Sequence, residues 1–170
     1  AHIGSNPDLE TIRGGAHERA LLRAFDDARF CIVILSGWSP EFMINRRIME
    51  KMESALNRGV TVYIGYGLVK SAHWKSGESW SVANPRNTAG EGAGNGRGQL
   101  LIQELSSPAN LLVVDDSYAV LGSYNWLSES GFFNMGKSWK ITDLTLVRAQ
   151  CVSAVRLFVI PADSQSARRM

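Results

Sequence analysis

The order of apolar and polar positions along the chain predicts helices that alternate with strands. Over residues 16–29 apolar side chains recur at the spacing of one helix face. These residues are Ala20, Leu21, Ala24, Phe25 and Ala28. A continuous apolar run over 30–35 predicts a strand that is buried on both faces. A second amphipathic helix is expected over 41–57 and a second buried strand over 60–64, which together form a β-α-β unit with parallel strands.

The second half of the chain begins with a segment of different composition. Glycine occupies every second position from Gly90 to Gly98, so we expect a long mobile loop over 67–98. A short helix over 98–105, strands over 111–114, 118–125 and 141–147, and a closing helix over 149–159 are then expected. With a disordered or linker start over 1–15 and a flexible tail over 161–170, this leaves one domain over 16–160.

Composition and charge narrow the class of protein. The chain has 170 residues, 45% of them hydrophobic, and a net charge of +2 without a block of Lys or Arg, so it lacks a strong electrostatic footprint for nucleic acid. Weak or partner-assisted binding stays open. No apolar run approaches the length of a membrane span. Cys31 and Cys151 stand far apart in the sequence, which argues against the disulfide framework of a secreted protein and favours the cytoplasm.

A motif in the second half carries the most specific information. Asp115 is followed after six residues by Gly122 and Ser123, and Asn125 lies two positions beyond Ser123. These residues resemble the core of the phospholipase D superfamily, whose pattern is H-x-K-x4-D-x6-G-S-x-N. The resemblance covers roughly residues 16–150, which corresponds to one lobe of such an enzyme.

The chain departs from this family at the two residues that carry the chemistry. Pro108 stands where the family has its nucleophilic histidine, and Asn110 replaces the lysine. In the family the histidine attacks phosphorus, while the lysine, serine and asparagine hold the non-bridging oxygens. Proline offers no nucleophile, and asparagine can donate a hydrogen bond but brings no charge. The sequence therefore predicts a lobe that is catalytically inactive on its own.

The resemblance also implies a fold and a mode of assembly. We expect an α/β fold with a single phospholipase D-like lobe, in which a mixed, mostly parallel sheet carries helices on both faces. Because the family's active site forms where two lobes meet, we expect a homodimer or a partner lobe, with nucleic acid or another phosphodiester as ligand. The family chemistry requires no metal or other cofactor, so none is expected.

The surviving motif residues have two interpretations each. Asn110, Ser123 and Asn125 are candidate substrate-binding donors, whereas Ser123 and Asn125 could instead satisfy buried backbone groups at a strand end. Asp115 and Gly122 are assigned structural roles, and for Asp115 we favour a role in the turn that follows residues 111–114.

Two other functions are alternatives to a phospholipase D-like lobe that has lost its catalytic residues. The first is a metal-independent phosphodiesterase or nuclease, completed by a partner lobe or by His73 from the 67–98 loop. The second is a nucleotide binder, because residues 131–138 match the P-loop pattern G-x-x-x-x-G-K-S. A P-loop must open a helix, and the residues after Ser138 have strand composition, which disfavours this alternative. The scattered histidines and cysteines lack the spacing of a zinc site.

Overall fold

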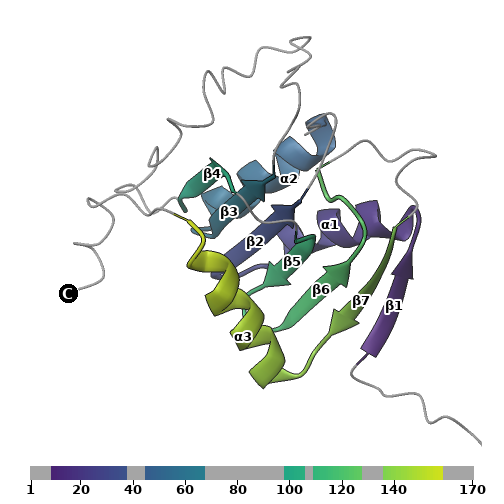
Figure 1. The fold of residues 1–170 in the computed structure, drawn as a ribbon. Coiled ribbons are helices and arrows are strands. Elements are labelled where there is room, and N and C mark those ends of the chain that lie inside the picture. Colours follow the sequence, from purple (N-terminus) through teal and green to yellow (C-terminus); the bar gives the residue numbers. More distant parts are fainter. Residues whose placement is uncertain (1–8, 38–44, 68–97, 106–108, 128–135, 159–170) are drawn as a thin grey trace, which may run out of the picture.

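The computed structural model describes residues 9–37, 45–67, 98–105, 109–127 and 136–158. They form a seven-stranded mixed sheet in the order β1-β7-β6-β5-β2-β3-β4, with three helices (Figure 1). The elements in chain order are β1 (Leu9–Arg13), α1 (Ala16–Asp27), β2 (Cys31–Ser36), α2 (Arg46–Asn57), β3 (Thr61–Tyr66), β4 (Leu100–Glu104), β5 (Leu111–Val114), β6 (Tyr118–Gly122), β7 (Lys137–Ile141) and α3 (Leu144–Val155).

The helices cover the sheet on both faces. Helices α1 and α2 pack on one face, where Phe25 and Met52 are fully buried against strand residues such as Ile34. Helix α3 lies on the opposite face, where Val147 and Ala154 are buried (Figure 1). Apart from Ser36 at the end of β2, the side chains of β2 and β5 are apolar, as expected for strands that are covered on both faces. The prediction of an α/β lobe with helices on both faces is confirmed.

The β-α-β unit predicted from the first half is confirmed. β2 and β3 pair in parallel, with Cys31 opposite Thr61, and α2 connects them. Asn45 begins α2 because its side chain accepts a hydrogen bond of 3.0 Å from the Ile48 amide. Residues 41–44 of the predicted helix lie outside the described residues.

Two sequence-based assignments in the second half are wrong. The helix expected over 98–105 is strand β4, which pairs in parallel with β3. A short apolar run does not by itself distinguish helix from strand, and here pairing with β3 decides. The strand expected over 141–147 ends at Ile141, because the Asp143 carboxylate accepts a hydrogen bond of 2.9 Å from the Leu146 amide and so begins α3.

The sheet is also less parallel than expected. Among the described strands four of the six pairings are antiparallel, β1–β7, β7–β6, β6–β5 and β5–β2, so the prediction of a mostly parallel sheet is wrong. The reason is the β5–β6 hairpin and the strands added beside it. β1 lies within the expected disordered or linker start and forms the edge strand beside β7.

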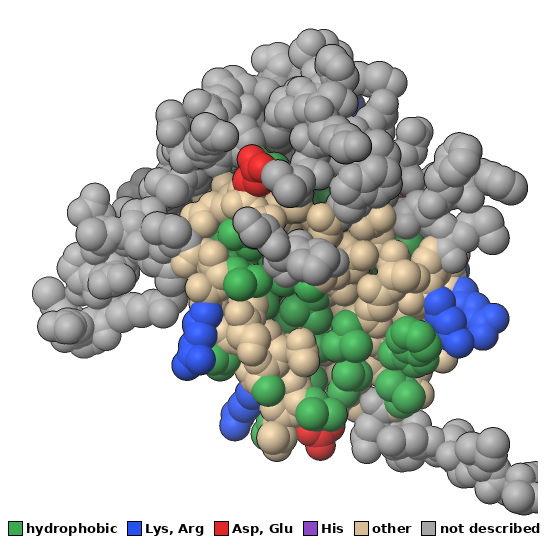
Figure 2. All heavy atoms as spheres, in the orientation of Figure 1, with side chains coloured by type: hydrophobic (Ala, Val, Ile, Leu, Met, Phe, Trp, Pro, Cys, Tyr) green, Lys and Arg blue, Asp and Glu red, His purple; other side chains and the backbone are tan. Residues whose placement is uncertain are grey.

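Helix α3 differs from the other helices in its outer surface. Leu144, Leu146 and Val152 are each about half exposed on it. Hydrophobic side chains gather on the face of the molecule where α3 lies (Figure 2). None of the helices in the described ranges has the length and the apolar run that a membrane crossing requires.

Candidate functional site

The β5–β6 hairpin places the predicted site residues at its two ends. Leu111 pairs with Leu121 and Val114 pairs with Tyr118, so Asn110 and Ser123 lie at the open end and Asp115 lies in the turn at the other. The Gly122 amide extends the ladder by donating to the Asn110 carbonyl at 3.4 Å. Pro108 lies outside the described residues. The hairpin thus separates the candidate phosphate-binding end from the Asp115 end.

Asn110 binds the backbone at the end of β2. Its side-chain oxygen accepts a hydrogen bond of 2.8 Å from the amide of Gly37, the residue directly after β2. The contact joins the carboxyl end of β2 to the start of β5. Because the oxygen is used in this way, the amide nitrogen is the part of the half-buried Asn110 side chain that can donate to a ligand.

Ser123 joins the end of β6 to the start of β7. Its hydroxyl accepts a hydrogen bond of 3.1 Å from the Lys137 amide, and its own amide donates to the Lys137 carbonyl at 3.0 Å. The side chain is nevertheless exposed. Asn125, two residues further on, is half-buried between the buried residues Tyr124 and Trp126. The hydroxyl of Ser123 therefore has a backbone partner, and it is still accessible from solvent.

Gly122 lies where β7 approaches β6 most closely. A Cβ atom at this position would lie 2.2 Å from the Lys137 carbonyl oxygen and 2.6 Å from the Ser138 Cα, distances that real side chains do not reach. Only glycine fits here without moving β7.

We therefore expect Gly122→Ala to lower the free energy of unfolding by about 2–3 kcal/mol, because the backbone of β7 has to shift. Urea unfolding measures this change. Gly15→Ala is the control, since a Cβ atom at Gly15 meets nothing within 4 Å. Equal losses in the two variants would contradict the proposed close approach.

Asp115 occupies the turn and reaches beyond it. Its backbone has a φ of +51°, and the Ser117 amide closes the turn on the Val114 carbonyl at 3.0 Å. The buried carboxylate accepts three backbone hydrogen bonds, from Arg29 at 2.9 Å and from Phe30 and Cys31 at 2.8 Å each. Asp115 thus fixes the segment that leads from α1 into β2, at the end of the hairpin opposite Asn110.

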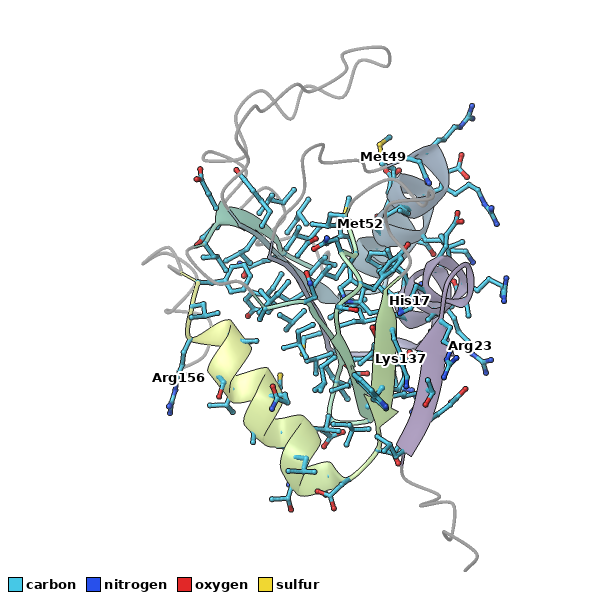
Figure 3. The ribbon with its side chains drawn as sticks, turned by 45° about the vertical axis from the view of Figure 1, so that its right-hand side comes forward. His17, Arg23, Met49, Met52, Lys137 and Arg156 are labelled. Carbon is cyan, nitrogen blue, oxygen red and sulfur yellow. The ribbon has the colours of Figure 1, made fainter. Side chains whose placement is uncertain are left out.

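His17 is a buried residue between α1 and the sheet (Figure 3). Its Nδ1 lies 2.9 Å from the Gly14 carbonyl oxygen and its Nε2 lies 2.9 Å from the Ser138 hydroxyl. Since a carbonyl can only accept, Nδ1 carries the proton and Nε2 accepts from Ser138 in the neutral ring. The ring also stacks on Tyr124, with centroids 4.0 Å apart, and meets the Trp126 ring edge-on.

The buried neutral imidazole of His17 has a consequence for stability at acidic pH. Burial lowers the pKa of His17 below its ordinary 6.5. Below pH 6.5 His17 is therefore protonated in the unfolded chain but stays neutral in the folded chain, so acid favours unfolding. The free energy of unfolding is therefore expected to be lower at pH 5.5 than at pH 7.0. Urea unfolding at both values measures this fall. The same fall in His17→Asn would assign the pH dependence to other groups.

The comparisons with known proteins bear on the fold. The sequence matches no protein-family model and no curated protein. Among solved structures the chain is similar to NucT from Helicobacter pylori, with a TM-score of 0.63 and 15% identity over 88% of this chain and 94% of that one. It is also similar to Nuc from Salmonella typhimurium, a phospholipase D family member, with a TM-score of 0.55 and 18% identity over 88% of this chain and 93% of that one.

The chain has a phospholipase D-like fold. A further similar structure is TrmBL2, described as an archaeal chromatin protein with a novel mode of DNA binding. Its TM-score is 0.60 at 15% identity, over 89% of this chain and 51% of that protein. At these identities the likeness establishes the architecture of the lobe.

Within this phospholipase D-like lobe the P-loop alternative loses its structural basis. Lys137 and Ser138, the last residues of the G-x-x-x-x-G-K-S match, begin strand β7, and the next helix begins only at Leu144. Residues 131–135 lie outside the described residues. A phosphate-binding loop needs its Lys and Ser at a helix N-terminus, where the amides and the helix dipole meet the ligand.

The hydrogen bond between His17 and Ser138 is one of the contacts in this phospholipase D-like lobe that the sequence does not predict. The two residues stand 121 positions apart, and no local motif at either residue predicts a contact with the other. His73, the alternative source of an imidazole, lies outside the described residues. In the described ranges no group of three His, Cys, Asp or Glu side chains could hold a metal ion.

Proposed function

We propose that this chain is a phospholipase D-like lobe without phosphodiesterase activity of its own, which binds a phosphodiester as a module of a larger cytoplasmic protein. The ligand class that we favour is nucleic acid, since TrmBL2, which shares the fold, is described as a DNA-binding chromatin protein. The site is the open end of the β5–β6 hairpin. Asn110, Ser123 and Asn125 are the proposed ligand-binding residues.

The contact between Asn110 and Gly37 carries this proposal. In the family a lysine at this position supplies a positive charge to the phosphate, whereas here the side-chain oxygen is bound to the end of β2 at 2.8 Å. The residue has thus acquired a structural contact that a lysine could not make, since lysine has no side-chain acceptor. The position supports the fold and retains one neutral donor.

The described residues also offer no imidazole nucleophile at this end of the hairpin. Both ring nitrogens of His17 are hydrogen-bonded, and its side chain is fully buried. An imidazole in this state presents no lone pair to a phosphorus atom, so it cannot form the covalent intermediate of the family. Neutral donors can still hold a phosphate oxygen, which favours binding over cleavage.

The binding proposal is tested by titrating fluorescein-labelled single-stranded and duplex DNA with the chain at several salt concentrations. Asn110→Asp keeps an acceptor for the Gly37 amide but replaces the donor with a carboxylate that repels phosphate. We expect this variant to bind at least about ten times more weakly.

Asn57→Asp is the matched control, because it makes the same charge change on an exposed residue at the C-terminus of α2. This helix end precedes Thr61, which pairs with Cys31 and so lies at the opposite end of β2 from Gly37. Equal weakening in both variants would indicate a general charge effect. No binding by the unmodified chain would contradict the binding role.

The family's assembly supports a second part of the proposal, that two lobes pair, either as a homodimer or with a partner lobe. Sedimentation equilibrium of the purified chain distinguishes a monomer from a homodimer. A monomer at all concentrations would leave a partner lobe as the required second half. This matters for the alternative function, because a partner that supplies the histidine would complete a metal-independent phosphodiesterase.

A further inference from the structure

The fold brings together the chain's two cysteines from distant parts of the sequence. Cys31 is the first residue of β2. Cys151 lies in α3, which packs on one face of the sheet and contacts β2 there. Both side chains are half-buried, both pack against the same apolar cluster, and both are free thiols. The two side chains are close enough for their thiols to form a hydrogen bond. Because the sequence has only these two cysteines, each has a single intramolecular partner.

The two thiols differ in acidity. The hydrogen bond with Cys31 lowers the pKa of Cys151 to about 7, although burial and the carboxylates of Asp115 and Asp116 oppose this. The same hydrogen bond and burial raise the pKa of Cys31. Of the two thiols, Cys151 is therefore the more acidic, and Cys31 is the one that holds its proton more tightly. The thiolate is the reactive form of cysteine.

We propose that Cys151 and Cys31 form a site of reversible oxidation, at which a small-molecule disulfide such as oxidised glutathione converts the pair into an intramolecular disulfide. The Cys151 thiolate attacks one sulfur of the oxidant, forms a mixed disulfide and releases one thiolate. Cys31 then loses its proton and attacks the Cys151 sulfur, which releases the second thiol. Two cysteine thiols are oxidised, and one disulfide is reduced to two thiols.

The reaction would link α3 to a central strand. Cys31 is tied to the β5–β6 turn because its amide donates to Asp115 at 2.8 Å, so the link joins α3 to the rigid part of the sheet. A disulfide that closes a loop of about 120 residues strongly lowers the conformational entropy of the unfolded chain and so stabilises the folded state. We expect the melting temperature to rise by about 10 °C on oxidation.

The experiment follows the full chain as it is exposed to oxidised glutathione at pH 7. After trapping of free thiols, peptide mass spectrometry should show a Cys31–Cys151 disulfide in the unmodified chain. In Cys31→Ser the reaction should stop at glutathione bound to Cys151. Cys151→Ser should react at least about ten times more slowly, because Cys31 is held as a thiol. Thermal unfolding of the oxidised and reduced chain checks the rise in melting temperature.

Three results would overturn the proposal. The first is a mixed disulfide that accumulates in the unmodified chain and is never resolved. The second is a disulfide between two chains in place of the one within a chain. The third is equal reaction rates in Cys31→Ser and Cys151→Ser, which would remove the distinction between an attacking and a resolving cysteine.

Discussion

Asp115→Ala is expected to lower the free energy of unfolding by about 3–5 kcal/mol, because three backbone N–H groups lose one charged acceptor. The Arg29, Phe30 and Cys31 amides converge on this carboxylate at 2.8–2.9 Å, between the end of α1 and the start of β2. The other carboxylate of the turn, that of Asp116, is exposed and pairs with Arg148 on the surface. Urea unfolding followed by circular dichroism measures the loss.

Asp116→Ala provides the control for this experiment, since it removes a neighbouring carboxylate that is exposed. Asp116 forms an ion pair of 3.0 Å with Arg148 on the surface, and pairs of this kind contribute about 1 kcal/mol or less. If the two variants lost similar stability, the three backbone hydrogen bonds would not be the reason that the chain has aspartate at position 115.

His17→Ala is expected to lower the free energy of unfolding by about 3–5 kcal/mol through the loss of a fully buried ring. The substitution removes the stacking on Tyr124 and leaves the Ser138 hydroxyl without its partner. It also opens a cavity between α1 and β7. Chemical denaturation of the two proteins at pH 7 gives the difference.

Ser138→Ala separates the hydrogen bond of His17 from its packing. This variant removes the hydroxyl and leaves the ring in place, so it should cost about 1–2 kcal/mol. A loss in His17→Ala no larger than that in Ser138→Ala would show that the imidazole contributes little through packing, against the interpretation of His17 as a core residue.

Much of the fold could be predicted from residues that act locally. The apolar run of β2 and the one-sided apolar pattern of α1 each identify an element without reference to the rest of the chain. The segment 100–104 could not be assigned in this way, because its strand conformation depends on pairing with β3. The start of α3 was missed for a different reason, since Asp143 begins a helix within residues that alternate weakly.

The sequence predicted which residues form the candidate site, but not which groups their side chains contact. The spacing of Asp115, Gly122 and Ser123 pointed to the phospholipase D-like fold, and it also placed Asn110 at the position of the missing lysine. The spacing could not reveal that Asn110 accepts a hydrogen bond from the Gly37 amide. Nor could it reveal that Asp115 accepts hydrogen bonds from the backbone amides of residues 29–31. These partners lie 73 or more positions away in the sequence. Contacts at such separations are decided by the packing of the sheet.

The central claim, that the lobe has lost catalysis and kept its scaffold, is tested most directly by a cleavage assay in excess chelator. DNA, RNA and a generic phosphodiester are each incubated with the purified chain and with the Pro108→His, Asn110→Lys double variant. The account predicts no cleavage by the chain as it stands and metal-independent turnover by the variant, which regains the nucleophile and the charge. Metal-independent cleavage by the unmodified chain, at a rate that follows the protein through purification, would contradict it.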